Sequence, residues 1–126
     1  MNIPKPVYVR FETPKELVEK AYQVAELASD TGKVCKGTNE VTKRVDRGEA
    51  QLVIIAEDVT PPEVVAHLPI LCDEKRIPYL YVPNKQELGV SSGLKKPTAS
   101  ISIVDAGAGK ELLAEIVTAI EPLRKK

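Results

Sequence analysis

Residues 36–48 carry the polar side chains with the clearest capacity for chemistry. Their sequence, KGTNEVTKRVDRG, is typical of a short helix in which Gly37 permits a sharp turn and Thr38 acts as the N-cap. At about 100° per residue, Val41 and Val45 lie on one face of this helix and are expected to be buried. The opposite face then presents four polar side chains, which are Asn39, Glu40, Lys43 and Arg47.

An amide, a carboxylate and two cations on one helix face match the edge of a nucleobase. Guanine offers an acceptor at O6 and donors at N1 and N2, which a lysine and a glutamate can meet, and an asparagine can bond in both directions. The N–H groups at the helix start add a place for a phosphate. The alternative is an ordinary solvated helix face, in which Glu40 and Arg44 form an i,i+4 ion pair.

Length and composition indicate one globular domain over residues 1–126, with residues 1–6 as a flexible tail. Apolar residues make up 43% of the chain and charged residues 29%, which is enough apolar material for a core. The sequence has no apolar run of the ~18 residues that a membrane span needs, and no signal-peptide pattern, so we expect a cytoplasmic protein. Cys35 and Cys72 are then expected to be buried, reduced thiols outside any metal-binding motif.

The net charge of zero hides an uneven distribution of charge. Residues 33–47 hold five basic and two acidic side chains, and residues 84–97 hold three basic and one acidic. These segments are positive on balance, by +3 and +2, so the rest of the chain is negative by five charges. If the two segments meet in space, they form a basic patch on an acidic body, which would suit a nucleic acid.

Hydrophobic periodicity and turn signals predict alternating helices and strands. Capping boxes at Thr13–Glu16, Thr60–Glu63 and Asn84–Glu87 mark three helix starts. Pro69 should distort the second of these helices, and Pro122 should end the last helix of the chain. The predicted helices run from about residue 13 to 29, 38 to 48, 60 to 72, 84 to 93 and 110 to 121, and the predicted strands cover 33–36, 52–56, 77–82 and 100–104.

The strands differ in their apolar pattern. Residues 52–56 are apolar throughout, as in a central strand covered on both faces, whereas residues 100–104 alternate like a half-buried strand. Strands that alternate with amphipathic helices indicate an α/β fold, a three-layer α/β/α sandwich with a sheet of about four strands.

The order of residues in the 36–48 segment adds a family resemblance. The run Lys-Gly-Thr-Asn-Glu-Val-Thr-Lys resembles the signature of the archaeal kink-turn-binding ribosomal protein family (L-seven-Ae). The resemblance extends from about Val7 to the C-terminal helix. It implies a mixed sheet and binding to a kink-turn, an RNA internal loop with a sharp bend, tandem sheared G·A pairs and one extruded nucleotide. Further matches at the family's spacing lie at residues 52–59, 67–75, 77–79 and 85–89.

The resemblance implies that Asn39, Glu40 and Lys43 contact the guanines of the G·A pairs, and that Gly37 and Thr38 allow the backbone to approach closely. A kinked RNA opens a groove that is too narrow in a regular A-form helix, so a helix terminus can reach base edges there. The full set of residues expected to bind RNA is Lys36, Gly37, Thr38, Asn39, Glu40, Lys43, Arg44, Thr60, Val64, Lys85, Leu94, Lys95, Lys96 and Pro97.

A second group of residues is implied to meet the extruded nucleotide, and it matches Thr60, Val64, Lys85 and Lys96. An apolar contact flanked by donors suits an unstacked base. Some relatives carry Glu where this chain has Thr60, so weaker selection of the extruded base is expected. The triplet Leu94-Lys95-Lys96 stands where the family's specificity loop often reads Val-Ser-Arg or Leu-Glu-Val, and its two lysines should increase non-specific attraction to phosphate.

The implied partners are RNAs that contain kink-turns, together with other core proteins of ribonucleoproteins. These RNAs are ribosomal RNA of the large subunit, box C/D and H/ACA guide RNAs, and the RNA of ribonuclease P. The chain would stabilise RNA shape with no cofactor, no bound metal ion and no catalytic residue of its own. We also expect a monomer when the protein is free.

Two other functions were weighed against RNA binding. The segment Ala106–Lys110 suggests a phosphate-binding loop of an enzyme, but the Walker pattern needs Gly where Val104 stands and Ser or Thr where Glu111 stands. His67, the only histidine, is interpreted as a packed or rim residue rather than a catalyst. The other alternative is a protein-docking module of the same fold that does not bind RNA specifically.

Overall fold

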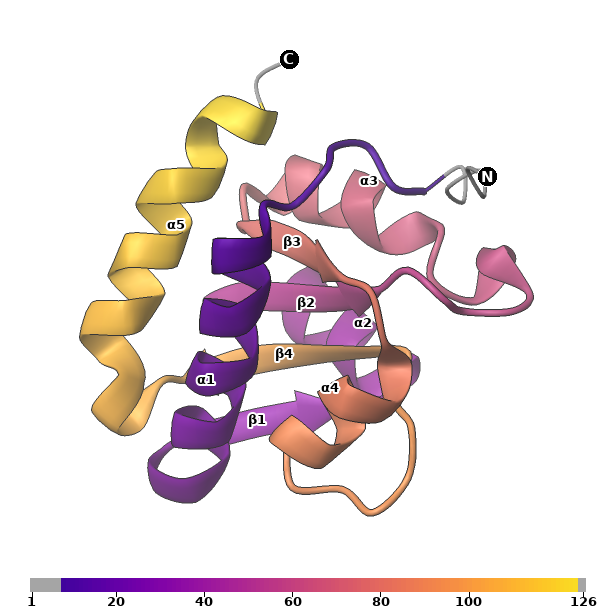
Figure 1. Ribbon diagram of the computed structural model, residues 1–126. Coiled ribbons are helices and arrows are strands. Elements are labelled where there is room, and N and C mark those ends of the chain that lie inside the picture. Colours follow the sequence, from indigo (N-terminus) through magenta and orange to yellow (C-terminus); the bar gives the residue numbers. More distant parts are fainter. Residues whose placement is uncertain (1–7, 125–126) are drawn as a thin grey trace.

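The structure is a computed structural model that describes residues 8–124, so the tail expected over residues 1–6 lies outside the described residues. Five α-helices and four strands alternate along this part of the chain, with two short 3-10 helices between them (Figure 1). The helices are α1 (Lys15–Thr31), α2 (Thr38–Asp46), α3 (His67–Lys75), α4 (Lys85–Ser91) and α5 (Lys110–Arg124). The strands are β1 (Lys33–Lys36), β2 (Leu52–Ala56), β3 (Tyr79–Val82) and β4 (Ser100–Asp105), and the 3-10 helices are η1 (Pro62–Val64) and η2 (Gly107–Gly109).

The four strands form one mixed sheet in the order β1-β4-β2-β3. Strand β4 pairs antiparallel with both β1 and β2, while β2 pairs parallel with β3. The two inner strands align Ile54 with Ile101 and Leu52 with Ile103. Every residue of β2 is buried, because helices cover both faces of the sheet. The mixed sheet expected from the family resemblance is confirmed.

Helices cover the sheet in two layers, which confirms the α/β/α sandwich. Helices α1 and α4 lie in front of the sheet in Figure 1, with α5 alongside α1, and α2 packs behind the sheet next to α3. The buried face of α1 consists of Leu17, Ala21, Val24, Ala25 and Ala28. None of the helices within residues 8–124 combines the length and apolar character needed to cross a membrane.

The strand directions decide which loops can meet. Because β1 and β2 both oppose β4, and β3 runs with β2, the carboxyl ends of β1, β2 and β3 lie beside the amino end of β4. We call this the carboxyl end of the sheet, and it is on the right-hand side of Figure 1. The starts of α2 and α4, the β2–α3 connection and the α4–β4 loop therefore all emerge at one end of the molecule.

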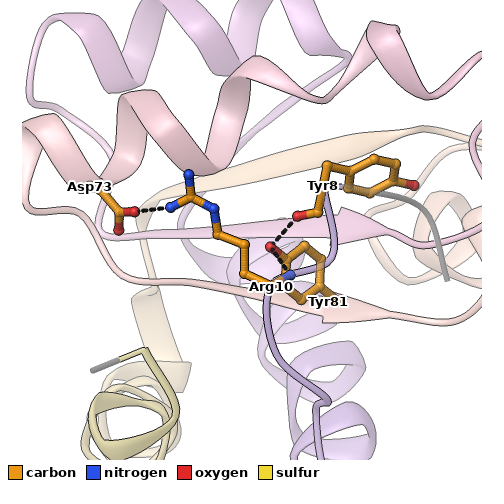
Figure 2. Close-up of polar contacts among 4 residues, drawn as sticks. All are labelled: Tyr8, Arg10, Asp73 and Tyr81. Carbon is orange, nitrogen blue, oxygen red and sulfur yellow. Dashed lines mark hydrogen bonds and ion pairs between the residues drawn. The ribbon is translucent and has the colours of Figure 1, made fainter. Parts of the chain in front are cut away.

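A segment that precedes α1, residues 8–13, lies across the outer strand β3 as a strap (Figure 2). The hydroxyl of Tyr81 donates to the carbonyl of Tyr8 over 2.6 Å and accepts the backbone N–H of Arg10 over 3.1 Å. Arg10 also forms an ion pair with Asp73 of α3. Burial raises the pKa of the Tyr81 hydroxyl, more than its hydrogen bonds and nearby Arg10 lower it. The strap thus joins β3 to α3.

Two of the predicted capping boxes are wrong. The N-cap of α1 is Pro14, which has no side-chain cap, and the Thr13 hydroxyl instead accepts the backbone N–H of Tyr81 over 3.2 Å. At the second box, the chain forms only the short helix η1 after a cis Thr60–Pro61 bond, and α3 begins later at His67. At Thr13 a tertiary contact thus replaces the local cap that the sequence pattern predicts, and at Thr60 no side-chain cap forms.

The two prolines expected to disturb helices do not do so. Pro69 lies in the first turn of α3, where a backbone N–H would have no helical acceptor, so the helix tolerates it. Helix α5 continues past Pro122 to Arg124, and Leu123 packs against the core in this last turn. Distortion at Pro69 and termination at Pro122 are therefore corrected.

Strand β4 is more deeply buried than its alternating sequence predicts. Both Ser100 and Ser102 are completely buried, as are Ile101 and Ile103 on the other face. A central position in the sheet explains this, because helices cover both faces of β4. The two cysteines are free thiols as expected, but only Cys72 is buried, since Cys35 of β1 is partly exposed.

Candidate nucleic-acid interface

The carboxyl end of the sheet brings four predicted segments together. The backbone N–H of Gly37 donates to the carbonyl of Ser100 over 3.1 Å, which joins the start of α2 to the start of β4. The N–H of Ala56 donates to the carbonyl of Ala99, and the N–H of Glu57 donates to the carbonyl of Val82. These bonds tie the exits of β1, β2 and β3 to the loop that enters β4.

Gly37, rather than Thr38, is the N-cap of α2. Its φ of 89° and ψ of 142° are accessible essentially to glycine alone, and no atom lies within 4 Å of the place a β-carbon would occupy. Thr38 is the first residue of the helix, and its hydroxyl lies 3.3 Å from the buried hydroxyl of Ser100. The helix start is thus held by the sheet on one side and open on the other.

The outer face of α2 presents the predicted base-contacting side chains to solvent. Val41 and Val45 are completely buried below the helix, and Asn39, Glu40 and Lys43 are exposed above it. Glu40 and Lys43 form an exposed i,i+3 ion pair with 3.6 Å between Oε1 and Nζ. The i,i+4 pair expected between Glu40 and Arg44 is not the one that forms.

Arg44 occupies a different environment from the other residues of the predicted set. It lies about 9 Å along the helix axis from Thr38, in the turns that lead away from the carboxyl end of the sheet. Its Nη1 donates to Glu49 Oε1 over 3.0 Å, and its side chain is only 21% exposed. The hydrogen bond that Arg44 donates to Glu49, together with the neighbouring Cys35 side chain, raises the pKa of the guanidinium. Arg44 thus lies one helical turn from Glu40, but its guanidinium pairs with Glu49 rather than with Glu40.

The β2–α3 connection places an apolar side chain on the surface at the same end of the molecule. Thr60 is exposed, and Val64 in η1 is 41% exposed although it is a large apolar residue. Its neighbour Val65 is completely buried and fixes the position of η1. A solvent-facing valine beside a threonine hydroxyl is the arrangement expected for contact with an unstacked base.

Lys85 begins α4 next to this connection. Its backbone N–H donates to Asp58 Oδ1 over 2.8 Å, which links α4 to the chain that leaves β2. Asn84 is the N-cap, as predicted, and its Oδ1 accepts the N–H groups of Gln86 and Glu87 at 2.8 and 3.0 Å. The Lys85 side chain is half-buried at this junction.

The loop of residues 94–97 packs closely on α4. A β-carbon at Gly89 would lie only 2.1 Å from the carbonyl oxygen of Lys96, so only glycine allows this approach. The N–H of Thr98 donates to the carbonyl of Lys85 over 3.2 Å. Lys95, Lys96 and Pro97 are exposed on the outside of the loop, and Leu94 is half-buried.

The two segments with net positive charge, residues 33–47 and 84–97, lie side by side, which is the condition for a basic patch. A β-carbon at Gly93 would lie 3.8 Å from Lys36 Nζ, so the ammonium group at the end of β1 stands beside the 94–97 loop. Three carboxylates, those of Glu57, Asp58 and Glu87, lie close enough to the Tyr22 hydroxyl to raise its pKa. Burial, more than these carboxylates, raises the pKa of Tyr22 to about 12.

Three residues that position this surface were missed at the level of sequence. They are Ser100, which holds the start of α2; Asp58, which binds the start of α4; and Gly89, which admits the 94–97 loop. A glycine inside a helical pattern is a recognised signal of close packing, so Gly89 could have been found. The other two depend on pairing between strands and could not.

The residues proposed for other chemistry have ordinary roles. The glycines of η2 form a turn and a helix start, as predicted. His67 is exposed on the first turn of α3, and its Nε2 lies 2.8 Å from the Thr42 hydroxyl. No group of three or more histidine, cysteine, aspartate or glutamate side chains within residues 8–124 is arranged to hold a metal ion.

The fold and this surface define a class, namely small three-layer α/β/α proteins that present a glycine-led helix start and lysine-bearing loops at the carboxyl end of a mixed sheet. Residues 19–113 match the family model described as the ribosomal protein L7Ae/L30e/S12e/Gadd45 family, and the chain belongs to this family. Among solved structures, it is similar to a Giardia lamblia 15.5kD RNA binding protein, with 34% identity and a TM-score of 0.88. That match covers 94% of this chain and 98% of the other.

Proposed function

We propose that the protein acts as one RNA-binding domain that recognises kink-turns and stabilises their bent form. The observation that carries the proposal is the meeting of four segments at the carboxyl end of the sheet, namely the α2 start, the β2–α3 connection, the α4 start and the 94–97 loop. Membership of a ribosomal protein family and the similarity to an RNA binding protein support it.

The start of α2 would read the G·A pairs. The Glu40 carboxylate can accept from guanine N1 and N2, the Lys43 ammonium can donate to O6, and the Asn39 amide can do both. Glu40 and Lys43 lie 3.6 Å apart on one face of the helix, so both can reach the same guanine once their exposed ion pair separates. The open space at Gly37 lets the RNA backbone approach the helix start without a clash.

The extruded nucleotide would lie on the β2–α3 connection. Val64 offers the apolar surface for the base, and the Thr60 hydroxyl and the Lys85 ammonium offer polar contacts on either side. A hydroxyl both donates and accepts, unlike a carboxylate, so Thr60 should select weakly among bases. Lys36, Leu94, Lys95, Lys96 and Pro97 would contact the phosphates and sugars beside this nucleotide.

Such contacts change RNA shape through differential affinity. A kink-turn exchanges between extended and bent states, and a protein that binds the bent state more tightly shifts the population toward it. We propose that the chain serves in this way, without catalysis of its own, in the cytoplasm. Its partners would be other ribonucleoprotein proteins and RNA of the large ribosomal subunit, of box C/D and H/ACA particles, and of ribonuclease P.

The direct test is a titration of the protein into an end-labelled kink-turn RNA, with energy transfer between the ends as the measure of bending. A control RNA replaces the tandem G·A pairs with Watson–Crick pairs. We expect bending and tight binding only with the G·A pairs. Glu40→Ala should weaken binding by roughly 10- to 150-fold, because a hydrogen bond to a charged group contributes about 1.5–3 kcal/mol.

A matched control is available in the chain. Glu115 forms a similarly exposed ion pair with Lys20, 3.4 Å apart, on α5 and α1. Glu115→Ala removes the same charge far from the proposed surface and should leave RNA affinity unchanged. Equal, salt-sensitive binding to both RNAs would reduce the basic patch to non-specific attraction, and no binding at all would favour a protein-docking module.

A further inference from the structure

A chain of two hydrogen bonds connects the first turn of α2 to the first residue of α3. The hydroxyl of Thr42 donates to the carbonyl of Thr38 over 2.7 Å. The same oxygen lies 2.8 Å from Nε2 of His67. A hydroxyl has a single hydrogen, and it is already given to Thr38, so the Thr42 oxygen must accept from His67 Nε2–H.

The two helices that these hydrogen bonds join are both anchored in the core. His67 follows the buried Val65 and precedes the buried Leu68, so its backbone cannot move without disturbing the core. The N–H of Leu68 also donates to the carbonyl of Val65 over 3.1 Å. On the other side, Val41 is buried beneath the first turns of α2. The His67 imidazole therefore connects α2 and α3, and both helices are anchored in the core at this point.

The connection is directed at the part of α2 that the proposed function uses. Thr38 is the first residue of the helix, and its carbonyl belongs to the turn that carries Asn39 and Glu40. A helix of nine residues is too short to be stable by itself, so its first turn depends on tertiary contacts. The hydroxyl contact with Ser100, at 3.3 Å, holds Thr38 from the sheet side. Thr42 and His67 hold it from the side of α3.

We infer that His67 is a positioning residue for RNA recognition, which orients the first turn of α2 through Thr42. This inference rests on the proposed function and gives a role to the only histidine of the chain. Nε2 carries a hydrogen both in the required neutral tautomer and in the imidazolium, so the histidine donates in either state. The side chain itself need not touch the RNA.

The test compares kink-turn affinity and melting temperature for His67→Ala, Thr42→Val and the double variant. Because the contact is partly open to water, we expect each single variant to weaken RNA binding by roughly threefold to tenfold. The affinity falls in proportion to the time that the first turn spends out of position. The double variant should be no weaker than Thr42→Val alone, because the two residues act through one chain of bonds.

Two further variants separate positioning from simple stability. His67→Gln keeps an N–H donor at similar reach and should restore most of the affinity. Lys75→Ala breaks another polar contact between α2 and α3, an exposed pair with Asp46 at 3.9 Å, and should leave RNA affinity unchanged. Amide hydrogen exchange of Val41 and Thr42, measured without RNA, should be faster in His67→Ala than in the wild type.

The outcomes distinguish the two proposals. If the wild type binds the kink-turn and His67→Ala binds equally well, the positioning role is wrong while the proposed function stands. An affinity of His67→Gln as low as that of His67→Ala would also overturn it, as would a loss that follows the melting temperature alone. If the wild type does not bind, the proposed function fails and the inference fails with it.

Discussion

Two helical segments of this protein have a glycine with positive φ at their start, and the two starts differ in function. Gly37 precedes α2 at the carboxyl end of the sheet, has φ of 89° and faces open space. Gly107 is the first residue of η2, which leads into α5 at the other end of the sheet, and it has φ of 57°. A β-carbon there would lie 2.4 Å from Thr31 Oγ1 and 2.6 Å from the Thr31 backbone. One glycine keeps a surface accessible, and the other allows two segments to pack.

The backbone N–H groups show the same difference. In η2, just before α5, the N–H of Gly107 donates to Asp105 Oδ1 over 2.9 Å, and the N–H of Ala108 donates to Thr31 Oγ1 over 2.8 Å. The protein itself thus occupies donors that a phosphate would need. A glycine-rich helix start is therefore informative about function only when the space in front of it is open.

The largest loss of stability is expected at Gly107, where the helix start is packed against Thr31. Gly107→Ala should destabilise the protein by about 2–4 kcal/mol, because left-handed strain adds to overlap with the Thr31 backbone. Urea unfolding followed by circular dichroism measures the change. A loss below about 1 kcal/mol would mean that the two segments separate easily, and the contrast with Gly37 would disappear.

A substitution of Gly37, at the open helix start, should destabilise the protein less than a substitution of Gly107. Gly37→Ala forces an alanine into a conformation that only glycine favours, without any steric overlap, so we expect a loss of about 1–2 kcal/mol in the free energy of unfolding. Its larger consequence should be weaker binding of kink-turn RNA in the energy-transfer assay. Equal destabilisation by Gly37→Ala and Gly107→Ala would contradict the distinction between the two glycines.

Asp105 should contribute a smaller amount to the closed start. Asp105→Ala removes the acceptor of the Gly107 N–H, which is exposed and can bond to water instead, so we expect a loss of about 1 kcal/mol. Asp105→Asn keeps a side-chain oxygen and should recover most of the stability in the same unfolding measurement. A loss as large in Asp105→Asn would assign the effect to charge rather than to the hydrogen bond.

The smallest effects on stability are expected for two lysines that begin helices at opposite ends of the sheet. Lys85→Ala and Lys110→Ala should each change the free energy of unfolding by less than about 0.5 kcal/mol. If Lys85 contacts a phosphate, its removal should reduce the slope of log affinity against log salt by about 0.7–0.9. Lys110→Ala should leave the slope unchanged, and equal slopes for both variants would show that Lys85 does not contact a phosphate.

Periodicity was sufficient to predict the layers and the burial of α2. Val41 and Val45 are buried, and Asn84 caps α4. The polar residues predicted for the outer face of α2 are exposed, namely Asn39, Glu40, Lys43 and Arg47. Threonine caps were less predictable, because a hydroxyl can bond to any nearby backbone group. Thr13 bonds to β3 and Thr38 to β4, and neither residue reveals this locally.

The candidate site was predictable only through the resemblance, since its parts are far apart in the chain. No local pattern could indicate that Lys36 stands beside Gly93, or that Asp58 binds the start of α4. Those contacts follow from strand order and direction, and the alternation of helices and strands leaves both undetermined. The burial of Ser100 and Ser102 has the same origin, because a central strand buries polar side chains that its sequence would expose.

The strap over β3 also bears on how the molecules behave toward one another. Strand β3 is one of the two outer strands of the sheet, and its four residues, YLYV, are all buried. An open strand of this kind is a template for pairing with a second chain, which leads to aggregation. The Thr13 hydroxyl occupies the N–H of Tyr81, and Arg10 and Tyr8 hold the Tyr81 side chain. Thr13, which does not cap α1, thereby occupies a backbone donor through which a second chain could extend the sheet.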